Sequence, residues 1–159
     1  MKNVDKIMHH PLYISSMKKI EDMEKDRIFC RHGMEHCLDV ARIACIEALR
    51  QKLDLSMDLI YSAALLHDIG RGQEYESGLS HEQAGWQISS RILEDTDFDE
   101  EEKKQILQAV LSHRRSDGCR QDLTGLLQKA DHTSRLCFLC SAWEQCNWCN
   151  EDKNSTIEL

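Results

Sequence analysis

The chain has 159 residues, and 41% of them are hydrophobic, which is enough to fill the core of one domain. Its formal net charge of -8 argues against a nucleic-acid polymer as the main partner, because binding to the phosphate backbone requires a basic surface. No apolar run approaches the roughly eighteen residues of a membrane span, and the first residues lack the apolar stretch of a signal peptide, so we expect a cytoplasmic protein without a membrane partner.

The pattern of apolar residues predicts helices in the first half of the chain. One proline, seven glycines and 6% aromatic residues leave little material for β-hairpins. A charged helix is predicted from Ser15 to Arg27, and a second, with one broad apolar face, from Arg31 to Gln51. The third, from Ser56 to Asp68, is so continuously apolar that we expect it to be the most buried. A polar loop is predicted from Gly70 to Ser80.

The second half is predicted to be helical as well. Ser80 and Gln83 form a capping-box pattern at the start of a helix that runs to about Glu94. Asp97 or Asp99 can cap the next helix, from Glu100 to Ser112, whose acidic first turn suits the helix dipole. After a polar loop over 114–121, a last helix runs from Leu123 to about Leu139, and the tail from Glu151 is polar. We therefore predict a single all-α domain over 1–159, with a core over roughly 20–140 and a cysteine-rich extension over 137–159.

Metal-competent side chains recur at the ends and on the apolar stretches of these helices. The adjacent His67 and Asp68 close the third helix, where a charge beside so much apolar surface is costly unless a cation neutralises it. Taken alone, such a pair is usually an exposed helix end, and a lone histidine at a helix start or a lone aspartate is usually a surface residue. Together, in a compact bundle, these groups can meet in one pocket. The set comprises His36, His67, Asp68, His81, His113 and Asp131.

The order of these residues resembles that of the HD-domain metal-dependent phosphohydrolases. The local contexts agree over roughly 20–140: His36-x-Leu38-x-Val40-Ala41, Ala64-Leu65-Leu66-His67-Asp68-Ile69-Gly70 and Ala130-Asp131. The resemblance implies a compact helical bundle of the HD-domain type and a first metal ion held by His36, His67, Asp68 and Asp131. His81 and His113 match two further histidines of the binuclear members, in which Asp68 would bridge the ions.

The resemblance thus implies one or two divalent transition-metal ions as cofactors. Imidazole and carboxylate ligands do not choose among iron, manganese, zinc, cobalt and nickel, and magnesium is a further candidate. His32 lies one helical turn before His36 on the predicted helix and competes with it as a ligand. The sequence context favours His36, which leaves His32 to face the substrate or support the ligands. His132, next to Asp131, is expected to be a bystander.

Arg71 stands where many members of the family carry a lysine, four residues beyond His67. An arginine can hold a phosphate bidentately, but it does not readily donate a proton. We therefore expect Arg71 and Asp68 to act in catalysis with the general acid unassigned, since Glu35, Glu82 and Asp68 cannot be ranked for acid–base roles. Arg114, Arg115 and Arg135 are further candidates for phosphate binding, although each also fits a surface residue or a structural ion pair.

The C-terminal cysteines form a CxxC-x5-CxxC pattern of Cys137, Cys140, Cys146 and Cys149. Four thiolates at this spacing can surround a structural zinc ion or, less readily, an iron–sulfur cluster. Reduced thiols packed as small hydrophobic groups explain the pattern equally well. Cys30, Cys37 and Cys45 lie among apolar helical positions and are expected in the core.

The leading hypothesis from the sequence is a metal-dependent phosphohydrolase that acts on a small phosphorylated metabolite. The resemblance favours a nucleotide, with a dinucleoside polyphosphate as one candidate, and leaves a homodimer open. One alternative is a metal-containing module that senses a nucleotide without hydrolysing it. Another is a zinc- or redox-dependent interaction protein in which the cysteine tail carries the function.

Overall fold

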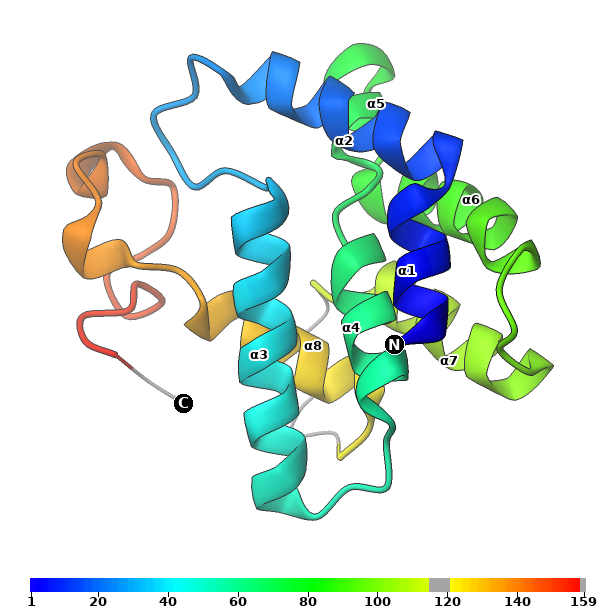
Figure 1. The fold of residues 1–159 in the computed structure, drawn as a ribbon. Helices are drawn as coiled ribbons and strands as arrows, with labels where there is room; N and C mark the ends of the chain where they lie inside the picture. The colour runs from blue at the N-terminus through cyan, green and yellow to red at the C-terminus, as the bar shows by residue number, and fades with distance from the viewer. Residues whose placement is uncertain (115–120, 158–159) are drawn as a thin grey trace.

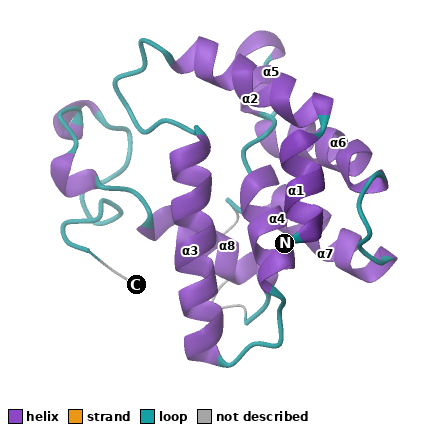
Figure 2. Ribbon diagram, viewed as in Figure 1, coloured by secondary structure: helices purple, strands orange, loops and turns teal. Residues whose placement is uncertain are grey.

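The computed structural model describes residues 1–114 and 121–157, and every regular element in them is helical. The predicted all-α fold is confirmed (Figures 1 and 2). In chain order the elements are α1 (Lys2–His9), α2 (Pro11–Glu24), α3 (Met34–Gln51), α4 (Met57–Leu66), α5 (Arg71–Ser77), α6 (His81–Glu94), α7 (Glu100–Ser112), α8 (Leu123–Thr133) and two 3-10 turns, η1 (Cys137–Leu139) and η2 (Trp143–Gln145).

Helix α4 lies at the centre of the molecule, as its continuous apolar sequence predicts. It packs against α1, α3, α7 and α8, and α3 also packs against α8 (Figure 1). Its residues from Leu59 onward are almost all buried, including Ala63, Ala64 and Leu66 at 0% exposure. Ser56 begins the helix by accepting a hydrogen bond from the Leu59 N–H (3.1 Å). The C-terminal end of α4 is therefore delivered into the protein interior.

The N-terminal region corrects the sequence-based expectation, which began the first helix at Ser15 and ended it at Arg27. Helix α1 was not predicted, and α2 begins at Pro11 and ends at Glu24. The reason is tertiary, because the Asp58 carboxylate of α4 accepts hydrogen bonds from the N–H groups of Asn3 (3.1 Å) and Val4 (3.0 Å). A helix start that is capped from another helix leaves no local sequence signal.

Three other boundaries also differ from the prediction. Helix α3 begins at Met34 rather than Arg31, which leaves His32 in the preceding loop. The predicted loop from Gly70 to Ser80 contains α5, and Gly78, the residue after this helix, has a φ of 75°. The last helix, α8, ends at Thr133 rather than near Leu139, so the cysteine-rich segment lies beyond it. The predicted loop over 114–121 falls largely on 115–120, outside the described residues, as does Arg115.

The structure shows which residues cap α6 and α7. The Ser80 hydroxyl accepts from the Gln83 N–H (3.4 Å), whereas the reciprocal capping box is formed by Asp99 and Glu102 at the start of α7. Asp97 instead binds the ammonium group of Lys2 (2.5 Å), which ties α1 to the loop before α7. Within the described residues, no helix combines the length and the hydropathy needed to cross a membrane.

Candidate metal centre

Two histidines at helix ends are oriented by the same local device. The ring Nδ1 of His67, which follows α4, lies 2.7 Å from the carbonyl oxygen of Ala64 three residues earlier. The ring Nδ1 of His113, which follows α7, lies 2.8 Å from the carbonyl oxygen of Val110, again three residues earlier. A carbonyl oxygen only accepts, so each Nδ1 carries a proton, and in the neutral ring that binds a metal each Nε2 presents a lone pair. Both rings are thus prepared as metal ligands by their own helices.

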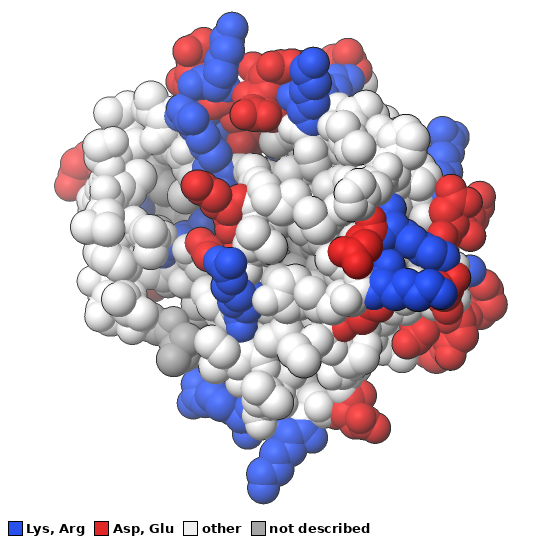
Figure 3. All heavy atoms as spheres, in the orientation of Figure 1, with Lys and Arg blue, Asp and Glu red and all other residues white. Residues whose placement is uncertain are grey.

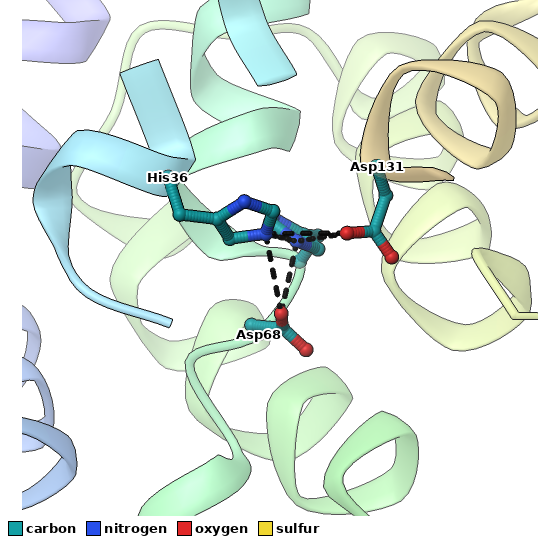
Figure 4. Close-up of side chains that lie close together, drawn as sticks. His36, Asp68 and Asp131 are labelled. Carbon is teal, nitrogen blue, oxygen red and sulfur yellow. Dashed lines mark hydrogen bonds and ion pairs between the residues drawn. The ribbon is translucent and has the colours of Figure 1, made fainter. Parts of the chain in front are cut away.

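One group of donor atoms lies around the Oδ2 atom of Asp68. His36 of α3, His67, Asp68 and Asp131 of α8 each offer an atom within 4.8 Å of the others. Figure 4 shows that His36, Asp68 and Asp131 point toward one another. His67 Nε2 lies 3.1 Å from Asp68 Oδ2, and His36 Nε2 lies 3.2 Å from Asp131 Oδ1. Ligands about 2.1 Å from a shared transition-metal ion are separated by about 3.0–3.4 Å. Two other separations in this group, His36 Nε2 to Asp68 Oδ2 (3.7 Å) and His67 Nε2 to Asp131 Oδ1 (3.8 Å), are longer. A small inward movement of these side chains would bring all four groups to a common ion.

A second group of donors uses the other oxygen of the same carboxylate. His81 Nε2, at the start of α6, lies 3.5 Å from Asp68 Oδ1, and His113 Nε2 lies 3.6 Å from it. The two imidazole nitrogens are 3.2 Å apart. Glu74 of α5 backs His81, since its Oε1 lies 3.0 Å from Nδ1. A carboxylate behind a histidine fixes the tautomer and strengthens the histidine as a ligand.

Electrostatics keep the central carboxylates ionised despite their burial. Burial opposes the charge of Asp68, but His67, His32 and Arg71 hold the pKa of its carboxyl well below the usual range. The same balance, with His36 and His67 as partners, lowers the pKa of Asp131. Against its own burial, His67 has its pKa raised to about 10 by the two aspartates. Such a concentration of buried acceptors and carboxylates suits a divalent cation.

A test of fit with a metal ion rests on Asp68. Its Oδ2 atom is fully buried and has no hydrogen-bond partner among the described residues. Buried oxygens without a hydrogen bond are rare, because a buried acceptor that lacks its partner costs about 1–3 kcal/mol. Coordination of a cation would satisfy this atom, and the surrounding imidazoles are the nitrogen ligands that transition metals prefer. The donor set therefore fits a metal ion.

The donor residues of the centre lie within a region that matches a known protein family. The family model of the HD domain matches residues 33–136, which include all of the donor residues described above. The chain belongs to the HD-domain family. An uncharacterized protein of Clostridium beijerinckii is 42% identical over 151 residues, covering 95% of each chain.

Two further proteins are similar to this HD-domain chain at lower identity. Ribonuclease Y of Acetivibrio thermocellus is 25% identical over 125 residues, which are 79% of this chain but 22% of that enzyme. A crystal structure of a predicted HD superfamily hydrolase from an uncultured Thermotogales bacterium has a TM-score of 0.64 and 24% identity. It covers 91% of this chain and 80% of the other, and it supports the fold.

Two arginines of the HD domain lie against the donor groups. Arg71 donates from Nε to Asp68 Oδ1 (2.9 Å) and from Nη1 to Glu74 Oε2 (3.2 Å). Arg135 donates from Nη2 to Asp131 Oδ1 (2.7 Å), and the same nitrogen is 2.9 Å from His36 Nε2. Arg114 is different, because its side chain is 55% exposed and its nearest charged partner is Glu82, 3.9 Å away. Arg71 and Arg135 thus flank the centre.

His32 lies next to the centre although it is not part of α3. The expectation that it shares a helix with His36 is wrong, because α3 begins two residues after it. From the loop, its Nε2 nevertheless lies 3.9 Å from Asp68 Oδ2. Behind it stands Glu24, whose role was missed because its only sequence signal is one acidic residue in a charged helix. As expected, His132 faces away, and its ring stacks on Trp148 at 5.1 Å.

The C-terminal cysteines lie outside the donor groups of this centre. Among the described residues, the groups of three or more donors within 4.8 Å involve only histidine, aspartate and glutamate, so the predicted set of four thiols does not form such a group. Cys149 is exposed and donates to Asp152 Oδ2 (2.9 Å). Burial, with smaller contributions from the thiols of Cys137, Cys140 and Cys146, raises the pKa of Cys30. A zinc ion held by the C-terminal cysteines stays a prediction from the sequence.

Proposed function

We propose that this protein is a metal-dependent phosphohydrolase that acts on a small phosphorylated substrate, with nucleotides as the substrate class. One observation carries the proposal. The two oxygens of Asp68 face two separate donor groups, one of His36, His67 and Asp131 and one of His81 and His113. A bridging carboxylate between two imidazole-rich groups is the arrangement expected for a pair of divalent ions that act on a phosphoester.

The two donor groups indicate which residues would hold each ion and which metals suit them. A bound pair of divalent ions supplies an activated water and offsets the charge of the phosphate. One ion would be held by His36, His67, Asp68 and Asp131, and the other would be held by Asp68, His81 and His113. Because the donors include four imidazoles, iron, manganese, zinc, cobalt or nickel suit the centre better than magnesium, which prefers oxygen ligands.

The contacts of Arg71 and Arg135 support a role for both residues in phosphate binding. Both guanidinium groups now contact the carboxylates of the centre, at 2.9 Å to Asp68 and 2.7 Å to Asp131. Cations bound by those carboxylates would compete for the same oxygens, which leaves guanidinium donors for a phosphate anion. An arginine stabilises charge on the phosphoryl oxygens but does not give up a proton near neutral pH. We therefore assign these residues to binding and charge stabilisation.

The surface charge favours a small substrate over a nucleic-acid polymer. On the face shown in Figure 3, Lys and Arg side chains lie beside Asp and Glu rather than forming one continuous basic area. The formal net charge of -8 repels a polyanion at long range. A local site with two cations and two arginines can still bind one phosphorylated metabolite.

Metal analysis combined with a substrate panel tests the proposal. We expect the wild type to bind two ions per chain, Asp68→Asn to lose both, and His113→Gln to lose one. Asp39→Asn removes an exposed carboxylate of α3 and serves as the matched control with full metal content. The wild type should release phosphate or a nucleoside monophosphate from a panel of nucleoside monophosphates, dinucleoside polyphosphates and cyclic nucleotides.

Two outcomes would contradict the proposal. Bound metal without turnover of any phosphoester would favour a nucleotide-sensing module over an enzyme. Metal retained by Asp68→Asn but lost from Cys137→Ser would move the functional metal to the C-terminal segment, as in a zinc-dependent interaction protein.

A further inference from the structure

Glu24 is a buried carboxylate outside both donor groups. It is the last residue of α2, it is 3% exposed, and it lies outside the region 33–136 that matches the HD-domain family. Its Oε2 accepts from the backbone N–H of His32 (2.7 Å). Its Oε1 lies 2.5 Å from His32 Nδ1 and accepts from the hydroxyl of Tyr75 (2.5 Å). Both oxygens of this carboxylate are therefore used to hold one histidine.

The hydrogen bonds around Glu24 fix the ring of His32. The carboxylate grips the backbone and the side chain of the same residue, so rotation of the ring would break at least one bond. The loop that carries His32 is itself tied down, because Arg27 Nε donates to the carbonyl oxygen of Cys30 (2.8 Å). The His32 side chain is 4% exposed. A ring held in this way is preorganised, and little conformational freedom is lost when it makes a further contact.

The hydrogen bond to Glu24 also sets the tautomer. Burial would raise the pKa of Glu24, but the hydrogen bonds from His32 and Tyr75 hold it at about 2, so the carboxylate only accepts. The proton of a neutral His32 ring is therefore on Nδ1, and Nε2 presents a lone pair. That lone pair faces Asp68 Oδ2 at 3.9 Å, the buried oxygen without a hydrogen-bond partner.

A carboxylate oxygen has two lone pairs, so Asp68 Oδ2 can bind a cation through one and accept a hydrogen bond through the other. A donor that lies between Asp68 Oδ2 and His32 Nε2 would serve both acceptors. Water presents two O–H donors and can satisfy both atoms at once. The His32 ring stands edge-on to the ligand ring of His36, with centroids 5.9 Å apart. His32 is not a member of the donor group that includes His36, so it is placed beside that group rather than within it.

We propose that His32 Nε2 accepts a hydrogen bond from the attacking water beside Asp68, and that Glu24 is the positioning residue that fixes the tautomer and orientation of His32. This inference rests on the proposed phosphohydrolase function. It gives the centre an oriented acceptor that neither Arg71 nor Arg135 can supply, since a guanidinium group has no acceptor atom. It also explains why a carboxylate is buried at the end of α2.

The tautomer provides a test that does not depend on activity. In protein labelled with 15N-histidine, two-bond proton–nitrogen correlation spectra distinguish Nδ1–H from Nε2–H, and His32→Gln identifies the signal. We expect Nδ1–H in the wild type. In Glu24→Gln, the amide oxygen takes the backbone N–H and the amide NH2 faces Nδ1, so the ring should change to Nε2–H. Glu21→Gln, at an exposed position one turn earlier on α2, should leave the signal unchanged. A wild-type ring with Nε2–H would overturn the proposal.

Kinetics with p-nitrophenyl phosphate test the role of the water contact. Loss of a residue that orients a bound group typically costs about 10–100-fold in activity. We expect Glu24→Gln and His32→Gln to lower kcat by about this factor with little change in KM and with full metal content. If Glu24→Gln fails to fold, Tyr75→Phe provides the test instead. It removes one hydrogen bond from Glu24 and should lower kcat by a smaller factor.

The kinetic outcomes separate this inference from the proposed function. A wild type that hydrolyses no phosphoester would contradict the proposed function. In that case the tautomer measurement still decides whether Glu24 positions His32. An active wild type with unchanged kcat in both variants overturns the role in catalysis. A loss of metal in parallel with kcat would also overturn it, because the pair would then support the metal ligands.

Discussion

Substitution of Gly70 by alanine is expected to disrupt the half of the centre that depends on His81. A Cβ atom at position 70 would lie 2.1 Å from the carbonyl oxygen of His81 and 2.4 Å from the backbone nitrogen of Gly85, whereas ordinary contact begins at 3.4 Å. Both neighbours are backbone atoms and cannot rotate away. The first turn of α6 must therefore retreat by about 1 Å, and overpacking of this kind costs about 1–3 kcal/mol.

The retreat of α6 has a consequence for metal binding as well as for stability. His81 Nε2 already lies 3.5 Å from Asp68 Oδ1, and its displacement would remove it from reach of an ion shared with His113. We expect Gly70→Ala to lower the free energy of unfolding by about 3 kcal/mol, the upper end of the range for overpacking, because neither contact can relax. In metal analysis, the variant should bind one ion where the wild type binds two.

Gly72→Ala is the matched control for this experiment. It places the same methyl group two residues along, inside α5, where the nearest atoms are the flexible Cγ and Cδ of Lys19 at 3.1 Å. The lysine chain can move aside, and alanine is favoured over glycine within a helix by about 1 kcal/mol. Urea unfolding followed by circular dichroism should give a midpoint at or above that of the wild type. Equal midpoints for Gly70→Ala and Gly72→Ala would refute the argument from backbone contact.

Three further predictions concern stability, pH and the C-terminal segment. Asp58→Ala should lower the free energy of unfolding in urea by about 1–3 kcal/mol, because the N–H groups at the start of α1 lose their acceptor, and an unchanged midpoint would show that these hydrogen bonds add nothing to stability. The pKa of Glu24 is about 2, below its ordinary value of 4.5, so its contribution of about 3 kcal/mol is full above pH 4.5 and is lost as the pH falls towards 2. Unfolding of the wild type at a series of pH values should therefore show a steeper acid loss than that of Glu24→Gln, and parallel curves would refute it. Cys137→Ser and Cys149→Ser should both keep the wild-type content of two metal ions per chain, because the thiols of the C-terminal segment form no donor group among the described residues; zinc lost from Cys137→Ser alone would contradict this expectation.

The helical class and most of the centre can be predicted from the chain because their signals are local. A continuous apolar run predicts that α4 is buried, and His67 and Asp68 follow it directly, so their delivery into the interior needs no knowledge of distant residues. His81 and His113 are likewise tied to helix ends, which the capping pattern at Ser80 and the end of α7 mark. These residues could be grouped by their place on helices before any contact was known.

The grouping of the donor residues around the two oxygens of Asp68 depends on contacts between distant segments of the chain. Only the packing of α3, α6, α7 and α8 around the end of α4 decides that the two oxygens of Asp68 face different imidazole groups. Glu24 lies eight residues from His32, across a loop whose path no periodicity predicts, so their pairing could not be inferred from spacing. Local patterns in a sequence report which face of a helix is apolar and where it ends. Which buried polar groups satisfy one another is settled by long-range packing, because a buried carboxylate is stable only where the fold brings its donors to it.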